Sequence, residues 1–109
     1  MNLNDYQKQA MTTATYKDDT TGLMCSVLGL NGEAGEVAEK LKKIIRDKSY
    51  VITEIDKAMI AKELGDVLWY VASLSDLLGF SLDSVAQLNL SKLADRYERG
   101  VIKGSGDER

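Results

Sequence analysis

Apolar residues recur at every third or fourth position along most of the chain, which is the spacing that places them on one side of an α-helix. This pattern predicts four helices, over residues 5–16, 23–46, 55–78 and 82–99. Polar stretches that can begin or end a helix separate these segments. The candidate N-caps are Asn4, one of Asp18, Asp19 and Thr21, one of Thr53, Glu54 and Asp56, and Ser81, while Gly79 and Gly100 are suited to ending a helix.

The amino-acid composition favours the same all-helical fold. The chain of 109 residues is 44% hydrophobic and 28% charged, and it contains no proline. A sandwich or barrel would require more turn-forming residues. We therefore expect an all-α, four-helix bundle-like single domain over residues 1–100. The glycine-rich segment 101–109 is expected to be a flexible tail, with a mobile flap that brings Lys103 or Arg109 to an anionic ligand as the alternative.

The charge balance and the missing residue types exclude several classes of function. There are 17 acidic and 14 basic residues, a net charge of −3, which argues against binding to a nucleic acid polymer through its phosphates. The absence of histidine excludes His-containing catalytic triads and His-bearing zinc or di-iron sites. No apolar stretch reaches the roughly 20 residues of a membrane span, and no signal peptide is evident, so we expect a cytoplasmic protein without a membrane partner. Cys25, the single cysteine, is expected to be a small core residue.

Two carboxylate doublets carry the strongest chemical signal. Glu33 and Glu36 lie in the second predicted helix, and Glu63 and Asp66 lie in the third. A spacing of i, i+3 puts both acids of a doublet on one side of the helix, about one turn apart. Two such helices side by side would gather four carboxylates, and each pair at 4 Å would repel by roughly 4 kcal/mol at an effective dielectric of 20. Such a cluster needs a cation.

The four acids are not equivalent in a helical projection. At about 100° per residue, Glu63 lies inside the apolar arc of its helix, whereas Glu36 is the acid that points furthest from the apolar side. An ionised carboxylate that faces a core has to be paired or bound to a metal. The candidate ion-pair partners all point more naturally to solvent, and they are Lys40, Lys43, Arg46, Lys57 and Lys62. We therefore favour a metal site over ion pairs or a solvated acidic face.

Two further features have open interpretations. Gly29, Gly32 and Gly35 each disfavour a helix interior by about 0.8–1 kcal/mol relative to Ala, so this run needs a reason, such as the close approach of another backbone or a ligand, or a helix break. Asn89 falls inside the apolar arc of the fourth predicted helix. A buried amide there is either a hydrogen-bonded structural residue or a ligand contact.

Three segments together resemble the MazG-like family of all-α nucleoside triphosphate pyrophosphohydrolases. They are GLNGEAGEVAEKLKK, KELGDVLWYVASLSDLLG and NLSKLADRYERG, and the resemblance covers about residues 23–100. The shared pattern is ExxE, a spacer, ExxD on the next long helix, and then an Asn and basic residues on the last helix. A lone ExxE would be weak evidence, whereas the ordered set is specific. Many relatives have a further Glu directly before the first motif acid, where this chain has Gly32.

The resemblance implies a reaction and a set of site residues. The reaction is hydrolysis of a nucleoside triphosphate between its α- and β-phosphates to a monophosphate and pyrophosphate, with nucleotide-pool house-cleaning as the role. The implied catalytic and magnesium-binding carboxylates are Glu33, Glu36, Glu63 and Asp66, with Mn²⁺ as a substitute for Mg²⁺. The implied substrate contacts on the last helix are Asn89, Lys92 and Arg96.

Aromatic residues and the surplus of apolar surface extend this picture. Trp69 and Tyr70 offer flat surfaces for a nucleotide base, although aromatic residues on a buried helix are more often core or interface. Tyr70 faces the Glu63 side of the third predicted helix and is a candidate substrate contact, whereas Trp69 points away and is the better interface candidate. The apolar surface of this helix exceeds what one partner helix would cover, which, with the resemblance, predicts a homodimer or homotetramer.

Two other functions stay open at this point. One is a non-catalytic nucleotide-binding or regulatory helical module that retains the acids without turnover. The presence of Gly32, where many relatives have a further Glu, favours this alternative. The other is a structural helical interaction protein in which the acids are simply solvated.

Overall fold

The computed structural model describes all residues from Met1 to Arg109 and consists of α-helices joined by short connections. Helix α1 spans Leu3–Met11, α2 spans Asp19–Lys48, α3 spans Glu54–Leu77 and α4 spans Leu82–Glu98. The predicted all-α class with four helices is confirmed, and no strand is present. None of the helices combines the length and the apolar character that a membrane span requires.

Each helix begins at a side chain that accepts a hydrogen bond from the first turn. Asn2, rather than the predicted Asn4, caps α1 and forms a capping box with Asp5, whose backbone N–H lies 2.8 Å from Asn2 Oδ1. Helix α1 also ends earlier than predicted, where the hydroxyls of Thr12 and Thr13 donate to carbonyl oxygens three residues back, at 2.6 and 2.7 Å. The caps of the other helices are among the predicted ones, namely Asp18, Thr53 and Ser81.

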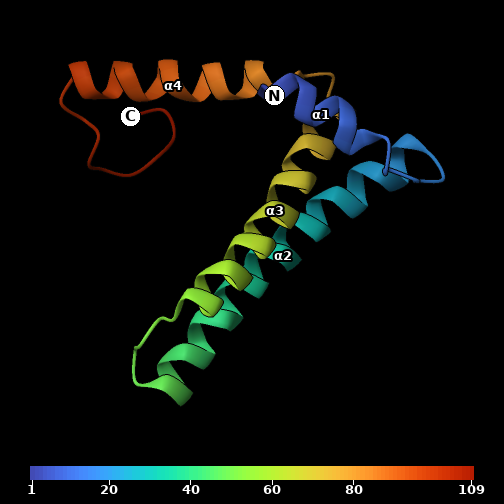
Figure 1. Cartoon of the computed structure of the whole chain (residues 1–109). Helices are drawn as coiled ribbons and strands as arrows, with labels where there is room; N and C mark the ends of the chain where they lie inside the picture. Colours follow the sequence, from blue (N-terminus) through green and yellow to red (C-terminus); the bar gives the residue numbers. More distant parts are fainter.

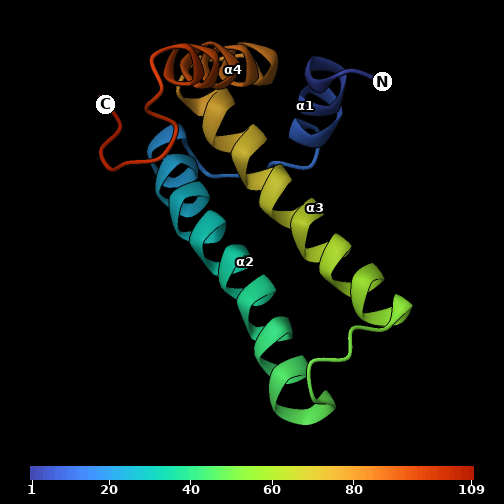
Figure 2. The ribbon, with the colours of Figure 1, turned by 90° about the vertical axis from the view of Figure 1, so that its left-hand side faces the viewer.

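The long helices α2 and α3 lie side by side and antiparallel, and form the hairpin that is the main body of the molecule (Figure 1). Both short helices lie at the end of the hairpin where α3 finishes. Helix α4 contacts α1 and α3 but makes no contact with α2. Figures 1 and 2 show α4 crossing this end and extending sideways instead of running along the hairpin. One side of the hairpin is therefore left without a helix over it.

A buried amide fixes the place of α4. Gln7 of α1 donates from Nε2 to the carbonyl oxygens of Ala72, at 3.2 Å, and Phe80, at 3.1 Å. Its Oε1 accepts from the backbone N–H of Leu82 at 2.9 Å. Because unpaired buried amides are costly, these three bonds hold α1 to the end of α3 and to the start of α4.

Hydroxyl groups join the two long helices near the same end. Ser26 of α2 and Ser73 of α3 are both fully buried, and their Oγ atoms lie 2.8 Å apart. The hydroxyl of Tyr16, in the α1–α2 connection, lies 3.2 Å from Ser26 Oγ. The contact between the helices is therefore polar near this end, and each buried hydroxyl depends on the others for a hydrogen-bond partner.

At the opposite end, an ion pair closes the hairpin. Lys48 Nζ lies 2.7 Å from Asp56 Oδ1, and Asp56 also accepts hydrogen bonds from the backbone and hydroxyl groups of Thr53 at 3.0 and 2.9 Å. The lysine, followed by the Thr53 bonds, lowers the pKa of Asp56 from 3.8 to about 2. Between them, Ser49 and Tyr50 adopt positive φ angles of 50° and 68°, which reverse the chain.

Only part of each predicted apolar arc is covered. Ile44, on the side of α2 nearest to Glu33, is buried, whereas apolar residues further round the arc stay exposed. The exposed members include Val27, Leu41 and Ile45 on α2 and Leu64 and Leu68 on α3. Cys25, predicted as a core residue, is exposed as well.

The accessible surface is large for a chain of this size. It amounts to 7912 Å², whereas a compact 12.0 kDa monomer exposes about 6,000 Å². The Cα radius of gyration is 16.8 Å, against about 13 Å for a compact domain of this length. Both comparisons agree with an open arrangement that leaves apolar side chains in contact with water.

Candidate active site

The hairpin brings together three of the four predicted acids. Glu33 from α2 and Glu63 and Asp66 from α3 each offer a carboxylate oxygen within 4.8 Å of the others. Glu33 and Glu63 are half-buried and Asp66 is exposed, so the group opens to solvent on one side. The fourth acid, Glu36, is exposed and lies outside this group. We call Glu33, Glu63 and Asp66 the acid trio.

The acid trio concentrates negative charge that the folded chain does not fully balance. The pKa of Glu33 is raised first by desolvation and then by the charge of Asp66, by contact with Glu63 and by the charge of Glu36. Ordinary solvated carboxylates would not show this effect. Three oxygen donors converging from two helices form a donor set that suits a hard divalent cation such as Mg²⁺.

Lys40 is the internal counter-ion of the trio. Its Nζ lies 3.4 Å from Glu63 Oε1, and the two side chains are only 26% and 17% exposed. The prediction that Lys40 points to solvent is therefore wrong. Lys40 stands seven residues after Glu33, about two helical turns, so it shares the side of α2 that faces α3, and its long side chain reaches across.

An aromatic wall stands beside the acids. Trp69 and Tyr70 line an open hollow of about 350 Å³ together with Glu33 and Asp66. The two rings meet edge to face, with centroids 5.0 Å apart and planes at 84°. Burial raises the pKa of Tyr70, and nearby groups that include Glu33 add to the effect. The prediction that Tyr70 faces the acids agrees with this placement.

Trp69 does not have the position predicted from its helical angle. Its Nε1 donates to the carbonyl oxygen of Ala10 at 3.2 Å and to Thr13 Oγ1 at 2.9 Å, at the end of α1. Helix α1 covers the side of α3 on which Trp69 projects, so the ring is half-buried within the chain and lines the hollow. The prediction that Trp69 points away from the acids is wrong for this reason, because the ring lines the hollow beside Glu33 and Asp66.

Helix α1 also borders the site through Tyr6. The pKa of this phenol is raised by burial and then by the negative charge of Asp66. The sequence pattern assigned α1 a structural role only, and a tyrosine at helical spacing carried no signal for a site on another helix.

One glycine of the run in α2 is explained by the aromatic wall. A Cβ atom at Gly29 would lie 2.3 Å from Cε1 and Cζ of Tyr70, so only glycine admits the ring so close to the helix. No atom lies within 4 Å of a Cβ built at Gly32 or Gly35. The run was expected to meet another backbone or a ligand, or to break the helix; the structure shows instead a side-chain ring, and among these three glycines it approaches Gly29 alone.

The predicted substrate contacts on α4 lie apart from the trio. Asn89 is exposed and makes no hydrogen bond, while Lys92 and Arg96 line a separate cavity of about 360 Å³ with the C-terminal segment. No residue is common to the two cavities, and α4 does not touch α2. Within one chain, the structure thus unites the acids and Tyr70 but not the α4 residues.

Comparison with known proteins identifies the family of the chain. Residues 25–101 match the family model of the MazG nucleotide pyrophosphohydrolase domain. The chain belongs to this family. It is also 49% identical over 114 residues to Gene 37 protein of Mycobacterium phage L5, with the whole of both chains covered. No solved structure matches.

The range that matches the MazG family model covers only part of the chain. It begins within α2 and ends just after α4, so it includes the acid trio, the aromatic wall and the predicted α4 contacts. Helix α1 and the segment beyond residue 101 lie outside it. Both of these outer parts nevertheless contact residues inside the matched range, α1 through Trp69 and the C-terminal segment through Arg96.

Proposed function

We propose that this MazG protein is an Mg²⁺-dependent nucleoside triphosphate pyrophosphohydrolase that cleaves between the α- and β-phosphates. The observation that carries the proposal is the acid trio, which sits beside an aromatic wall in a chain of the nucleotide pyrophosphohydrolase family. The products are a nucleoside monophosphate and pyrophosphate. Clearance of unwanted nucleotides from the cellular pool is the role we propose.

The donor set of the trio fits magnesium. Glu33, Glu63 and Asp66 supply only carboxylate oxygens, and desolvation, followed by the charges of the neighbouring acids, raises the pKa of Glu33. When bound, Mg²⁺ would neutralise phosphate charge and lower the pKa of a coordinated water, and Mn²⁺ would be a substitute. Lys40 supplies one positive charge to Glu63 in the chain itself and would have to leave that carboxylate free.

The remaining acid of the motif has a different task. Glu36 is exposed and lies outside the trio, one turn along α2 from Glu33. We propose that Glu36 acts as the general base. One of its carboxylate oxygens would accept a proton from the attacking water as the water oxygen bonds to phosphorus and the α–β bridging bond breaks. Pyrophosphate leaves with the electron pair of that bond.

The aromatic wall provides a place for the nucleotide base. Trp69 is held by the two hydrogen bonds that its Nε1 donates to Ala10 and Thr13, and Tyr70 is held against Gly29 and the Trp69 ring. Because these rings are already held in place, stacking of a base on them would cost the protein little additional side-chain entropy. The triphosphate would then extend toward the trio.

A homo-oligomer would complete the site. The exposed apolar residues on α2 and α3 and the excess of about 1,900 Å² of surface over a compact monomer favour a second copy against the hairpin. We propose that Asn89, Lys92 and Arg96 of one copy serve the acid trio of another. A mixture of Glu63→Gln and Lys92→Gln chains, each inactive alone, would then regain activity after unfolding and reassembly, because some mixed sites contain both intact residues.

The primary experiment combines a nucleotide panel with matched variants. Canonical and modified triphosphates are incubated with Mg²⁺, and monophosphate and pyrophosphate are measured. Glu63→Gln should abolish turnover while the helical circular dichroism spectrum is retained. Glu39→Gln is the matched control, because Glu39 pairs with Lys42 on α2, outside the trio.

Two results would contradict the proposal. Tight nucleotide binding without product from any member of the panel would instead select the non-catalytic nucleotide-binding module. Turnover in Glu63→Gln equal to that of Glu39→Gln would remove the trio from the reaction.

A further inference from the structure

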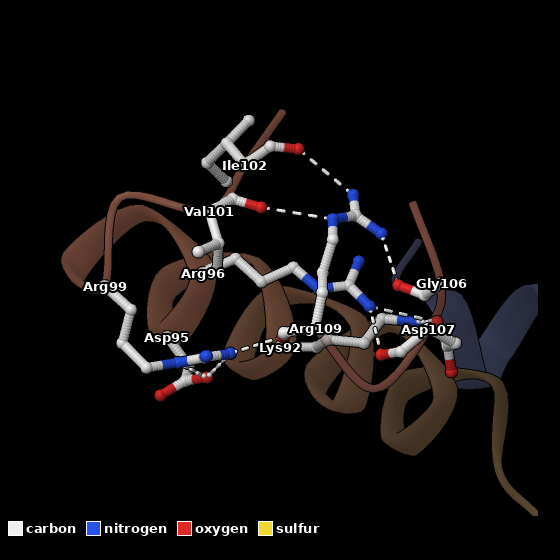
Figure 3. Close-up of polar contacts among 9 residues, drawn as sticks. All are labelled: Lys92, Asp95, Arg96, Arg99, Val101, Ile102, Gly106, Asp107 and Arg109. Atoms are coloured by element: carbon white, nitrogen blue, oxygen red, sulfur yellow. Dashed lines mark hydrogen bonds and ion pairs between the residues drawn. The ribbon is translucent and has the colours of Figure 1, made fainter. Parts of the chain in front are cut away.

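The C-terminal segment, residues 101–109, folds back against α4 (Figure 3). The guanidinium of Arg109 donates to the carbonyl oxygens of Val101, Ile102 and Gly106 at 3.1, 3.0 and 2.7 Å. Arg99 donates in turn to the carbonyl oxygen of Arg109 at 2.5 Å. The segment is thereby tied into a closed loop, and the side chain of Arg109 is engaged by this loop instead of reaching toward an outside ligand.

The loop places a carboxylate on two cations of α4. Asp107 Oδ1 lies 2.8 Å from Lys92 Nζ and 3.1 Å from Arg96 Nη2. Arg96 Nη2 also donates to the backbone carbonyl of Asp107. The Lys92 and Arg96 contacts lower the pKa of Asp107, so it is ionised at neutral pH. One carboxylate oxygen therefore occupies the point at which the two cations converge, as Figure 3 shows.

This carboxylate does not satisfy the arginine completely. The side chain of Arg96 is only 7% exposed, yet its Nε is buried without a hydrogen-bond partner. Nε and Nη2 form one edge of the guanidinium fork, which matches two oxygen atoms of the same oxyanion. Asp107 gives that edge a single side-chain oxygen. Because unpaired buried donors are rare and costly, the vacant Nε points to an acceptor other than Asp107.

We propose that Lys92 and Arg96 form a phosphate-class oxyanion site and that Asp107 is an internal competitor that occupies it until such an anion displaces the C-terminal loop. A phosphate group offers several oxygens, so it can bridge Arg96 Nε, Arg96 Nη2 and Lys92 Nζ together. The assignment of the anion to a substrate triphosphate rests on the proposed function, whereas the competition between Asp107 and a phosphate oxyanion does not.

The test measures anion binding without metal, so it does not depend on turnover. Inorganic pyrophosphate is titrated into the full-length protein with EDTA, by calorimetry, for the wild type and for Asp107→Asn. Removing the competitor should tighten pyrophosphate binding roughly 3- to 10-fold, which is the range expected for the loss of two partly exposed ion pairs. Glu98→Gln is the control, because it removes the same charge from an exposed α4 side chain that makes no hydrogen bond or ion pair and does not line the cavity, and it should stay within about twofold of the wild type.

Variants on α4 locate the anion. Lys92→Gln and Arg96→Lys should each weaken pyrophosphate binding, and Lys92 is exposed enough that its replacement leaves the fold intact. Equal affinities of Asp107→Asn and Glu98→Gln would overturn the competition, and wild-type affinity in Lys92→Gln would overturn the site. A separate titration with a nucleoside triphosphate distinguishes the anion source, since tightening by Asp107→Asn for pyrophosphate but not for the triphosphate would assign the site to product or free phosphate.

Discussion

The contact between Gly29 and Tyr70 allows a quantitative test of how the aromatic wall is built. Gly29→Ala adds a methyl group 2.3 Å from two carbon atoms of the Tyr70 ring. The ring would have to move by about 1.1 Å to reach the ordinary contact distance of 3.4 Å. It cannot move freely, because Trp69 packs against it edge to face and is itself held by α1. Gly35→Ala is the control, since its Cβ meets open space.

The expected magnitude follows from two opposing terms. Replacing Gly by Ala in a helix interior stabilises the folded state by about 0.8–1 kcal/mol, and this term is common to both variants. Overpacking costs about 1–3 kcal/mol and applies only at Gly29. Gly35→Ala should therefore raise the free energy of unfolding, and Gly29→Ala should fall about 1–3 kcal/mol below it, a difference of at least roughly 4 °C in Tm.

Urea unfolding at one fixed protein concentration measures this difference, and fixed concentration is required because assembly would add to stability. Near-ultraviolet circular dichroism should change in Gly29→Ala but not in Gly35→Ala, because the rings of Trp69 and Tyr70 shift. In a Tyr70→Ala background, Gly29→Ala should become stabilising. If Gly29→Ala is as stable as Gly35→Ala, the explanation of the glycine by the ring contact is refuted.

Three further predictions concern charge and hydrogen bonding. Because the pKa of Asp56 is lowered to about 2 in the folded protein, its contribution to stability is complete above pH about 4 and is lost as the pH falls toward 2. The difference in unfolding free energy between wild type and Asp56→Asn should shrink over that interval, and a constant difference down to pH 2 would refute the assignment. Lys40→Met removes the counter-ion of Glu63, so the metal-free protein should melt lower and the Tm rise with Mg²⁺ or Mn²⁺ should exceed that of the wild type; an unchanged rise would show that Lys40 does not compete with the metal. Ser26→Ala and Ser73→Ala should each cost about 1–3 kcal/mol by stranding a buried hydroxyl, whereas the double variant should cost clearly less than their sum, and additive losses in urea unfolding would contradict the pairing.

Local features of the fold could be predicted from the sequence because they depend on neighbouring residues. The apolar period located all helices, and Thr53 and Ser81 were recognisable caps because capping involves the next three residues only. The convergence of Glu33, Glu63 and Asp66 follows from i, i+3 spacing on two adjacent helices. These predictions needed no knowledge of which helix lies on which side.

The errors arise where one helix meets another. Periodicity shows which face of α2 is apolar but not how much of it α3 covers, so Cys25 was placed in a core that stops short of it. Trp69 was assigned away from the site because the position of α1 was unknown. Lys40 could have been found, since it stands two turns after Glu33 on the same side of α2. No sequence pattern indicated the contact of Asp107 with Lys92, because that contact depends on a loop closed by Arg109.

The three hydrogen bonds of Gln7 have a consequence for the order in which the chain becomes complete on the ribosome. Leu82, which donates to the Gln7 amide, follows it by 75 residues. At about 5–20 residues per second, translation adds that stretch in roughly 4–15 s. During this interval Gln7 cannot form its hydrogen bonds to Phe80 and Leu82, and α4 is not yet present to contact α1. The position of α4 thus depends on an amide in α1 that is synthesised 75 residues before its partner Leu82. A chain that loses α1 would keep the α2–α3 hairpin but would lack the hydrogen bonds that hold the start of α4.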